Sequence, residues 1–274
     1  MSRRKLSRRK TAERFRRNLF IILVFIFLFL PIFVLVLYSF NTSKMNILFE
    51  GFTFDWYSKL FENENLLDAF KNTLLIAIIS TLISTIIGTA SAIGLKKYNF
   101  FGKNLIEKLI YIPIVMPEIV LGIALLSSFT LVNLNLGLFS VLLSHIAFSI
   151  PFVITSVRSS LDALPKEYEE AAEDLGAGKF KTLFYVLLPL IKSGIVSGAL
   201  LAFTLSLDDV VISFFTAGPG TNTLPLYIYS VIKTGITPDV NALTTLMLII
   251  TATILTVSAF YQSRKITSRG GVLK

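Results

Sequence analysis

Three carboxylates interrupt long apolar stretches of the sequence: Glu118, Asp208 and Asp209. A carboxylate in hydrocarbon costs at least a few kcal/mol, so it normally faces a water-filled pathway or a cation. Glu118 follows Lys108 by about ten residues, or about 15 Å of helix, which predicts a position near the middle of a membrane. We therefore predict that the three acids line the route of a positively charged solute. The alternative places Glu118 in a buried bond to another helix and makes Asp208 or Asp209 the cap of the next helix.

The sequence shows no set of residues that would form a catalytic centre. His145 is the only histidine and cysteine is absent. We find no His-Glu-x-x-His zinc motif and no evident Ser/His/Asp arrangement, and a lone histidine in an apolar segment is usually a packed, hydrogen-bonded residue. Gly178-Lys179 begins like part of a phosphate-binding loop, but Phe180 stands where that loop requires Ser or Thr. We expect no catalytic residues, no metal site and no cofactor bound by this chain, so any energy must come from a partner.

The composition indicates that a membrane is the solvent of this chain. Its 274 residues are 54% hydrophobic and 16% charged, and this charge content is well below that of typical soluble domains. The net charge of +9 could suggest nucleic acid, but most of it lies before residue 19. That tail holds one acid, Glu13, and nine basic residues: Arg3, Arg4, Lys5, Arg8, Arg9, Lys10, Arg14, Arg16 and Arg17. A basic block beside an apolar run is the positive-inside signal of a cytoplasmic N-terminus, so we expect contact with a lipid bilayer and no nucleic-acid partner.

The first apolar run, Leu19–Tyr38, is long enough to cross a membrane. Arg3-Arg4 also permits a twin-arginine export signal, with the run as a signal peptide. However, the run is longer than a usual signal-peptide core, and no clean small-x-small cleavage site follows Tyr38. We therefore interpret it as an uncleaved first span.

The hydropathy pattern predicts further spans along the chain. The third is interrupted by Pro113 and Pro117, and the outward loop 41–66 holds few Lys or Arg, whereas basic residues gather at 96–108, 158–192 and 264–269. This distribution predicts an all-α integral membrane protein with six transmembrane helices and both termini in the cytoplasm. The further spans are Thr73–Leu95, Ile110–Leu131, Leu138–Val157, a fifth that begins near Pro189, and Leu243–Tyr261.

A polar, helix-prone segment, Glu170–Gly176, lies between the fourth and fifth spans. Pro165 suits the first turn of this helix, because its missing N–H costs nothing there. The glycine at its end can supply the left-handed residue that stops a helix, and a second helix is expected from about Lys179. Ala171 and Ala172 lie at the centre of one face, which suits insertion into a groove of another protein because alanine lets backbones approach closely.

This segment resembles the signature loop of the permease subunits of ATP-binding-cassette (ABC) importers. The signature is Glu-Ala-Ala, three residues, Gly, nine residues, an aliphatic residue, one residue and Leu-Pro. The one departure is a valine where the family usually has isoleucine. The matching residues are Glu170, Ala171, Ala172, Gly176, Val186, Leu188 and Pro189.

Further segments are similar to the PotC-type permeases of spermidine/putrescine ABC importers, over most of the chain from about residue 19. Permeases for iron, thiamine and other solutes in the same superfamily share related Leu-Asp-Asp segments. These segments therefore indicate the solute less specifically than the signature loop indicates an ABC importer permease. The similar segments are Pro113–Val120, Ser206–Phe215, Gly218–Gly220, Thr223–Ser230 and Thr237–Ala242.

The resemblance implies the fold of a type I ABC importer permease in the bacterial cytoplasmic membrane. It implies a basic cytoplasmic tail at 1–18, a transmembrane permease domain at 19–265 with a coupling loop at about 158–188, and a cytoplasmic tail at 266–274. The implied partners are a second homologous permease subunit, a dimer of ABC ATPase subunits and an extracytoplasmic polyamine-binding protein.

On this resemblance the chain is not an enzyme, because ATP and Mg²⁺ are used by the partner ATPase. The seven signature residues would couple the ATPase to the membrane domain, with Ala171, Ala172 and Gly176 giving a close fit and Glu170 a polar or ionic contact. Alternating access would then move spermidine or putrescine inward. The alternatives are a permease for another solute of the same superfamily and an ATP-independent channel or secondary transporter; a membrane enzyme has least in its favour.

Overall fold

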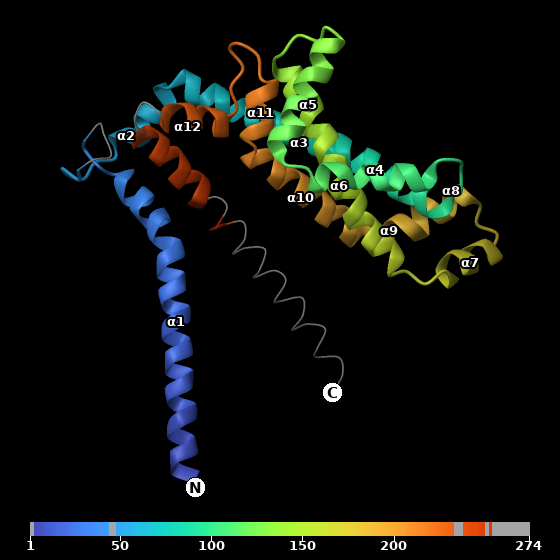
Figure 1. Cartoon of the computed structure of the whole chain (residues 1–274), viewed down its shortest axis with the longest axis horizontal. Helices are drawn as coiled ribbons and strands as arrows, with labels where there is room; N and C mark the ends of the chain where they lie inside the picture. Colours follow the sequence, from blue (N-terminus) through green and yellow to red (C-terminus); the bar gives the residue numbers. More distant parts are fainter. Residues whose placement is uncertain (1–2, 44–47, 233–237, 250–251, 254–274) are drawn as a thin grey trace. The chain divides into compact units, whose positions relative to one another are not determined.

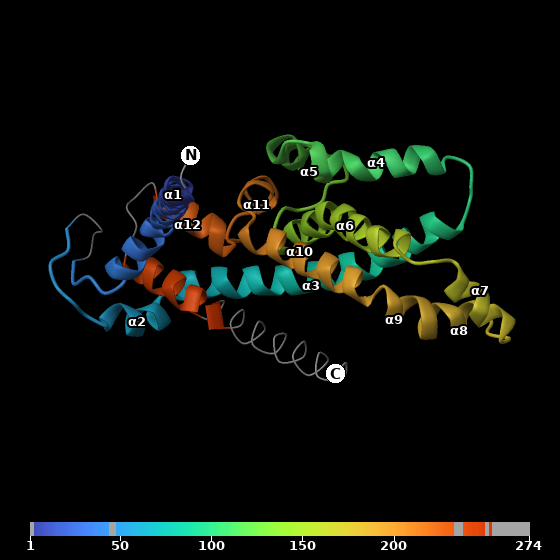
Figure 2. The same ribbon diagram turned by 90° about the horizontal axis from the view of Figure 1, so that it is seen from below.

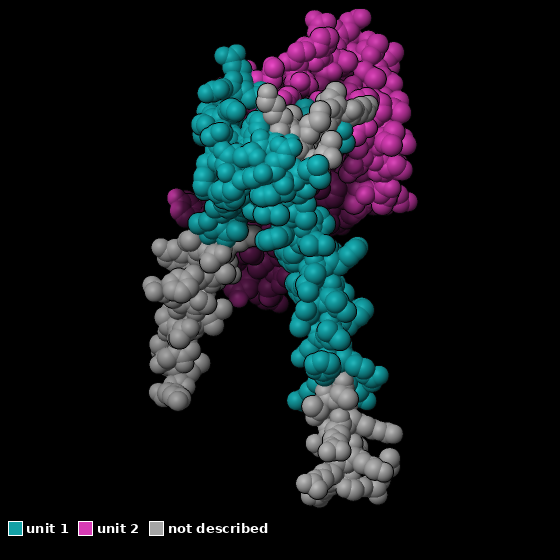
Figure 3. Space-filling model, turned by 90° about the vertical axis from the view of Figure 1, so that its left-hand side faces the viewer, with its two compact units in different colours: residues 1–64, 231–274 teal, residues 65–230 magenta. Residues whose placement is uncertain are grey.

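The computed structural model describes residues 3–43, 48–232, 238–249 and 252–253 of the chain. Every regular element in these ranges is a helix (Figure 1). The chain divides into two compact units, residues 1–64 with 231–274 and residues 65–230, which Figure 3 shows in different colours.

The first unit contains α1 (Arg3–Tyr38), which includes the predicted first span. Its part from Glu13 to Tyr38 is long and apolar enough to cross a membrane, and none of its most apolar window is buried within the chain. Such a helix is stable only where lipid or another protein covers its side chains. The structure also continues this helix through most of the basic tail, back to Arg3.

The rest of the first unit consists of short elements. The helices α2 (Asp55–Lys59) and η1 (Leu60–Glu62) lie in the predicted outward loop, where the indole N–H of Trp56 donates to the carbonyl of Asn41 at 2.6 Å. Residues 238–249 are helical and contain the start of the predicted last span. Most of that span, Leu243–Tyr261, lies outside the described residues.

The second unit is built around three long helices, two of which, α6 and α10, pack against each other (Figure 2). They are α3 (Glu64–Lys97), α6 (Leu138–Asp162) and α10 (Lys192–Asp208). Gly194 and Gly198, which the sequence places in a small-xxx-small pattern, are buried against α6, where a Cβ on Gly194 would lie 2.7 Å from the Cβ of Ser160. Small residues let α6 and α10 approach closely, as in many membrane proteins.

Two of the predicted spans are bent. The helices α4 (Lys103–Val115) and α5 (Glu118–Leu131) meet at 115°. Met116 is extended, and Pro117 has no N–H to continue the helix, which explains the break. The second bent pair is Lys179–Leu190 with α10, at 67°; its first part comprises α8 (Lys179–Lys181), the π-helical turn η2 (Thr182–Leu187) and α9 (Leu188–Leu190).

Within the described residues, three helices are long and apolar enough to cross a membrane, or up to five if each bent pair forms one span. The five coincide with the first five predicted spans. The predicted total of six and the side on which each terminus lies stay predictions. Two short helices, α11 (Val211–Thr216) and α12 (Leu224–Ile232), follow α10.

Candidate functional site

A cavity of about 410 Å³ in the second unit is lined by residues of α4, α5, α6, α10 and α11. Glu118, Asp208 and Asp209 all contribute to its wall. The structure therefore brings together the three acids that the sequence predicted to share a pathway. We call this cavity the acidic pocket.

Glu118 is the first residue of α5, directly after the 115° bend. The straight-helix estimate of its depth does not apply, because the chain turns between Lys108 and Glu118. Its side chain is exposed. Within the described part of the chain it makes no hydrogen bond or ion pair, and so the alternative of a buried bond to another helix of this chain is not observed.

Asp208 and Asp209 are neighbours with opposite surroundings. Asp208 ends α10, is exposed, and has no hydrogen-bonding partner among the described residues. The side chain of Asp209 is only 5% exposed. Its carboxylate accepts hydrogen bonds from the backbone N–H groups of Ile212 at 3.1 Å and Ser213 at 2.8 Å. Asp209 thus stabilises the N-terminus of α11, which is the capping role that the alternative interpretation described.

Sequence reasoning missed the group that holds Asp209 in place. His145 of α6 is 1% exposed, and its Nε2 lies 3.3 Å from the Asp209 carboxylate and 3.1 Å from the hydroxyl of Ser213. On the other side of the ring, Nδ1 lies 2.7 Å from the hydroxyl of Ser206. The expectation that the lone histidine is packed and hydrogen-bonded is confirmed. No Ser/His/Asp arrangement is evident in the sequence, because helices far apart in sequence bring these side chains together.

The predicted signature-loop helix is present as α7 (Glu167–Asp174). It begins after Pro165, which therefore precedes the first turn instead of lying in it. Gly176 has φ +81°, and Ala177 donates to the carbonyl of Ala172 at 3.0 Å, which closes the helix as expected. The second helix starts at Lys179, as predicted.

The seven signature residues fall into two groups. Glu170, Ala171 and Gly176 are exposed, and Ala172 is half-buried. Val186, Leu188 and Pro189 lie in η2 and α9, and Leu187 between them is 2% exposed and part of the core cluster with Ile191. Of the second half of the signature, Leu188 packs against this cluster and Pro189 is exposed, whereas Glu170, Ala171 and Gly176 of the first half leave an exposed face.

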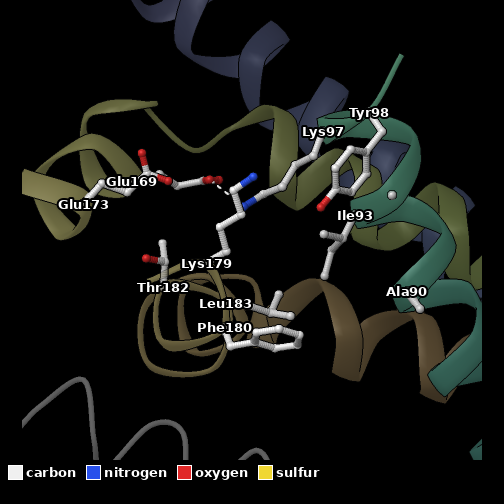
Figure 4. A pocket seen from close by; sticks show the side chains of 11 residues that line it. Ala90, Ile93, Lys97, Tyr98, Glu169, Glu173, Lys179, Phe180, Thr182 and Leu183 are labelled. Carbon is white, nitrogen blue, oxygen red and sulfur yellow. Dashed lines mark ion pairs between the residues drawn. The ribbon is translucent and has the colours of Figure 1, made fainter. Parts of the chain in front are cut away.

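An ion pair joins α7 to the end of α3. The ammonium group of Lys97 lies 2.6 Å from the carboxylate of Glu169. Beside this pair, a cavity of about 500 Å³ is lined by Lys97, Tyr98, Glu169, Lys179 and Phe180, among others (Figure 4). This ion pair between two partly exposed side chains is a direct contact between α7 and the end of α3.

Comparison with known proteins places this geometry in a family. Residues 84–265 match the family described as binding-protein-dependent transport system inner membrane component. The spermidine/putrescine transport system permease protein PotC of Shigella flexneri is 40% identical over 261 residues, which cover 95% of this chain and 99% of that protein. The putrescine transport system permease protein PotI of Escherichia coli K12 is 38% identical, over 85% of each chain.

Solved structures show the same fold. A chain of a bacterial ABC transporter involved in the import of the acidic polysaccharide alginate superposes with a TM-score of 0.71 at 18% identity, over 97% of this chain and 100% of that one. A chain of the MetNI methionine ABC transporter gives a TM-score of 0.59, also at 18% identity, over 73% of this chain and 94% of that one. The present chain has the ABC importer permease fold, and it belongs to the family of inner membrane components of binding-protein-dependent transport systems.

Proposed function

We propose that this chain is a permease subunit of an ATP-driven importer that moves spermidine or putrescine across the cytoplasmic membrane by alternating access. The observation that carries this proposal is the acidic pocket. Glu118 and Asp208 both face it, and neither carboxylate has a partner within the described residues. The similarity to PotC and PotI supports the same class of solute.

The chemistry of the acidic pocket suits a flexible polycation. Each ionised carboxylate would accept charge-assisted hydrogen bonds from an ammonium group. Phe148 and Phe152 of α6 line the same cavity, and their apolar rings suit the methylene segments between the amines. A neutral solute would leave both carboxylates of the cavity without a positively charged partner.

The position of α7 supports coupling to a separate ATPase. Its exposed face holds Glu170 and Ala171, while its other side is tied to α3 through the Lys97–Glu169 ion pair. An ATPase that grips the exposed face would move a helix already connected to the bundle. We propose an ATPase dimer, a second permease subunit and an extracytoplasmic binding protein as the partners.

The test is uptake of radiolabelled spermidine and putrescine by proteoliposomes that hold the complex purified through this chain. We expect uptake that requires ATP and in which the two polyamines compete. ATP-dependent transport of another solute without polyamine uptake would contradict the proposed substrate. Polyamine uptake without ATP, or a purified chain that brings no ATPase with it, would contradict the importer mechanism.

A further inference from the structure

A buried polar network adjoins the acidic pocket at Asp209, and its other members do not line that cavity. It joins four helices of the second unit and the junction between α10 and α11. Its members are Ser80 of α3, His145 of α6, Ser206 of α10, Asp209 of the junction and Ser213 of α11.

The hydrogen bonds of the network require a donor at Nε2 of His145, because the Asp209 carboxylate only accepts and the Ser213 hydroxyl donates to that carboxylate. With its proton on Nε2, the ring donates toward the Asp209 carboxylate and the Ser213 hydroxyl, at 3.3 and 3.1 Å. The Ser206 hydroxyl then donates to Nδ1 at 2.7 Å, and it can accept from Ser80 at 3.2 Å. This arrangement satisfies both nitrogens of a ring that has almost no access to water.

The Asp209 carboxylate is consequently held from two sides. The N-terminus of α11 supplies two backbone donors, the Ser213 hydroxyl donates at 2.8 Å, and His145 supplies a donor from the opposite helix. Asp209 itself is extended, with φ −65° and ψ 123°, and separates α10 from α11. At this junction both residues line the acidic pocket, but the carboxylate of Asp209 is buried against α6 and α11, whereas the preceding Asp208 is exposed.

We propose that His145 is a positioning residue: by holding Asp209, it fixes the junction between α10 and α11 so that the carboxylate of Asp208 faces the solute. The inference concerns a residue buried behind the pocket that never touches the solute. Its transport consequence rests on the proposed function, whereas its geometric consequence does not.

Substitutions of His145 can separate positioning from packing. A glutamine side chain at this position would place an amide N–H donor close to the position of Nε2, so His145→Gln keeps the bond to Asp209. His145→Asn keeps a polar group only near the position of Nδ1, and His145→Leu keeps volume alone. Val141→Ala, one turn earlier on α6 and also buried, is the matched control for a core defect.

The geometric test uses a single thiol. The chain has no cysteine, so Asp208→Cys introduces the only thiol of this subunit. In the purified complex we expect His145→Leu and His145→Asn to slow its modification by a cationic methanethiosulfonate reagent about fivefold, because the thiol no longer faces water. His145→Gln and Val141→Ala should leave the rate within about twofold. Equal rates in all variants, or a loss in Val141→Ala as large as that in His145→Leu, would overturn the inference.

The transport test is a double-mutant cycle in proteoliposomes. We expect His145→Leu to raise the KM for spermidine about tenfold with a smaller change in maximal rate, because a misplaced carboxylate weakens binding. In the Asp208→Asn background, His145→Leu should add little to the KM. With Asp208 present, His145→Gln should leave the KM for spermidine normal. Additive effects on KM would show that His145 acts independently of Asp208. Absence of polyamine uptake by the unmodified complex would contradict the proposed function alone, since the thiol test does not depend on the solute.

Discussion

Two adjacent aspartates show how surroundings decide the role of a residue type. Asp209 is satisfied by α11 and His145, so removing its carboxylate would leave buried donors without an acceptor. Asp208 has no such partner in the described part of the chain and faces a cavity. The predicted pathway role therefore applies differently to the two residues: Asp208, with Glu118, is free to meet a solute, and Asp209 supports the wall behind it.

The first prediction concerns these free carboxylates. Asp208→Asn and Glu118→Gln should each raise the KM for spermidine uptake about tenfold, because each removes one charge-assisted contact worth about 1.5 kcal/mol. Radiolabelled uptake over a range of spermidine concentrations measures this effect. Asp68→Asn is the control, because Asp68 pairs with Lys71 on the exposed surface of α3 and does not line the acidic pocket. A KM unchanged in both pocket variants would remove these positions from the pathway.

At the scale of elements, the end of α7 depends on one backbone conformation. Gly176 has φ +81°, where a β-branched residue is strained, by roughly 1–2 kcal/mol. We predict that Gly176→Val changes the turn after the exposed face of α7 and uncouples the ATPase from transport. ATP hydrolysis should then continue while spermidine uptake falls.

Gly178 provides a matched control two residues later. It has φ −67° and ψ 161°, a conformation open to any residue, and no atom lies within 4 Å of where its Cβ would be. Gly178→Val should therefore keep uptake and hydrolysis coupled. The ratio of ATP hydrolysed to spermidine imported, measured in the same proteoliposomes, should rise in Gly176→Val and stay normal in Gly178→Val. A normal ratio in Gly176→Val would contradict the coupling role of this turn.

The contact between α6 and α10 gives a second prediction for elements. A Cβ on Gly194 would overlap the hydroxyl oxygen of Ser160 and lie 3.0 Å from the backbone oxygen of Ser156. Gly194→Ala should thus destabilise the complex by about 1–3 kcal/mol through overpacking. Gly94 of α3 has open space around it, so Gly94→Ala should be neutral or stabilising, because alanine favours a helix by about 1 kcal/mol over glycine. A lower thermal unfolding temperature of the purified complex with Gly194→Ala, and an unchanged or higher one with Gly94→Ala, would confirm this packing; equal shifts would contradict it.

Sequence patterns predicted elements better than the angles between them. Pro113 and Pro117 indicated an interrupted span, but the 115° turn depends on packing of α5 against α11, where Gly122 meets the ring of Phe215. The signature loop was predicted in detail because the end of its helix depends on a single residue, Gly176, whose left-handed conformation can be expected from the local sequence. The network around His145 was not predicted, because its members come from separate helices and no local spacing connects them.

At the scale of the whole molecule, apolar length and the distribution of basic residues predict how the chain crosses the membrane. The five candidate spans of the described residues match five of the predicted ones, two of them as bent pairs. In contrast, the prediction of the side of the membrane on which each loop lies rests on the distribution of charge alone. Because a bent pair can also turn back toward the side from which it came, sidedness needs a direct test.

The absence of cysteine makes that test simple. Single cysteines would replace Ser58 of α2 and Asn133 of the turn after α5, both predicted to face outward, and Gly178 of the coupling loop, predicted to face inward. All three positions are exposed. In intact cells a membrane-impermeant maleimide should modify the thiols at 58 and 133 but reach the one at 178 only after the cells are broken, because the positive-inside rule retains the Lys-rich loop in the cytoplasm. Modification at 178 in intact cells would place the coupling loop outside. Protection of 133 alone would show that α4 and α5 form a re-entrant loop and not a span, which would change the number of crossings that the acidic pocket is built from.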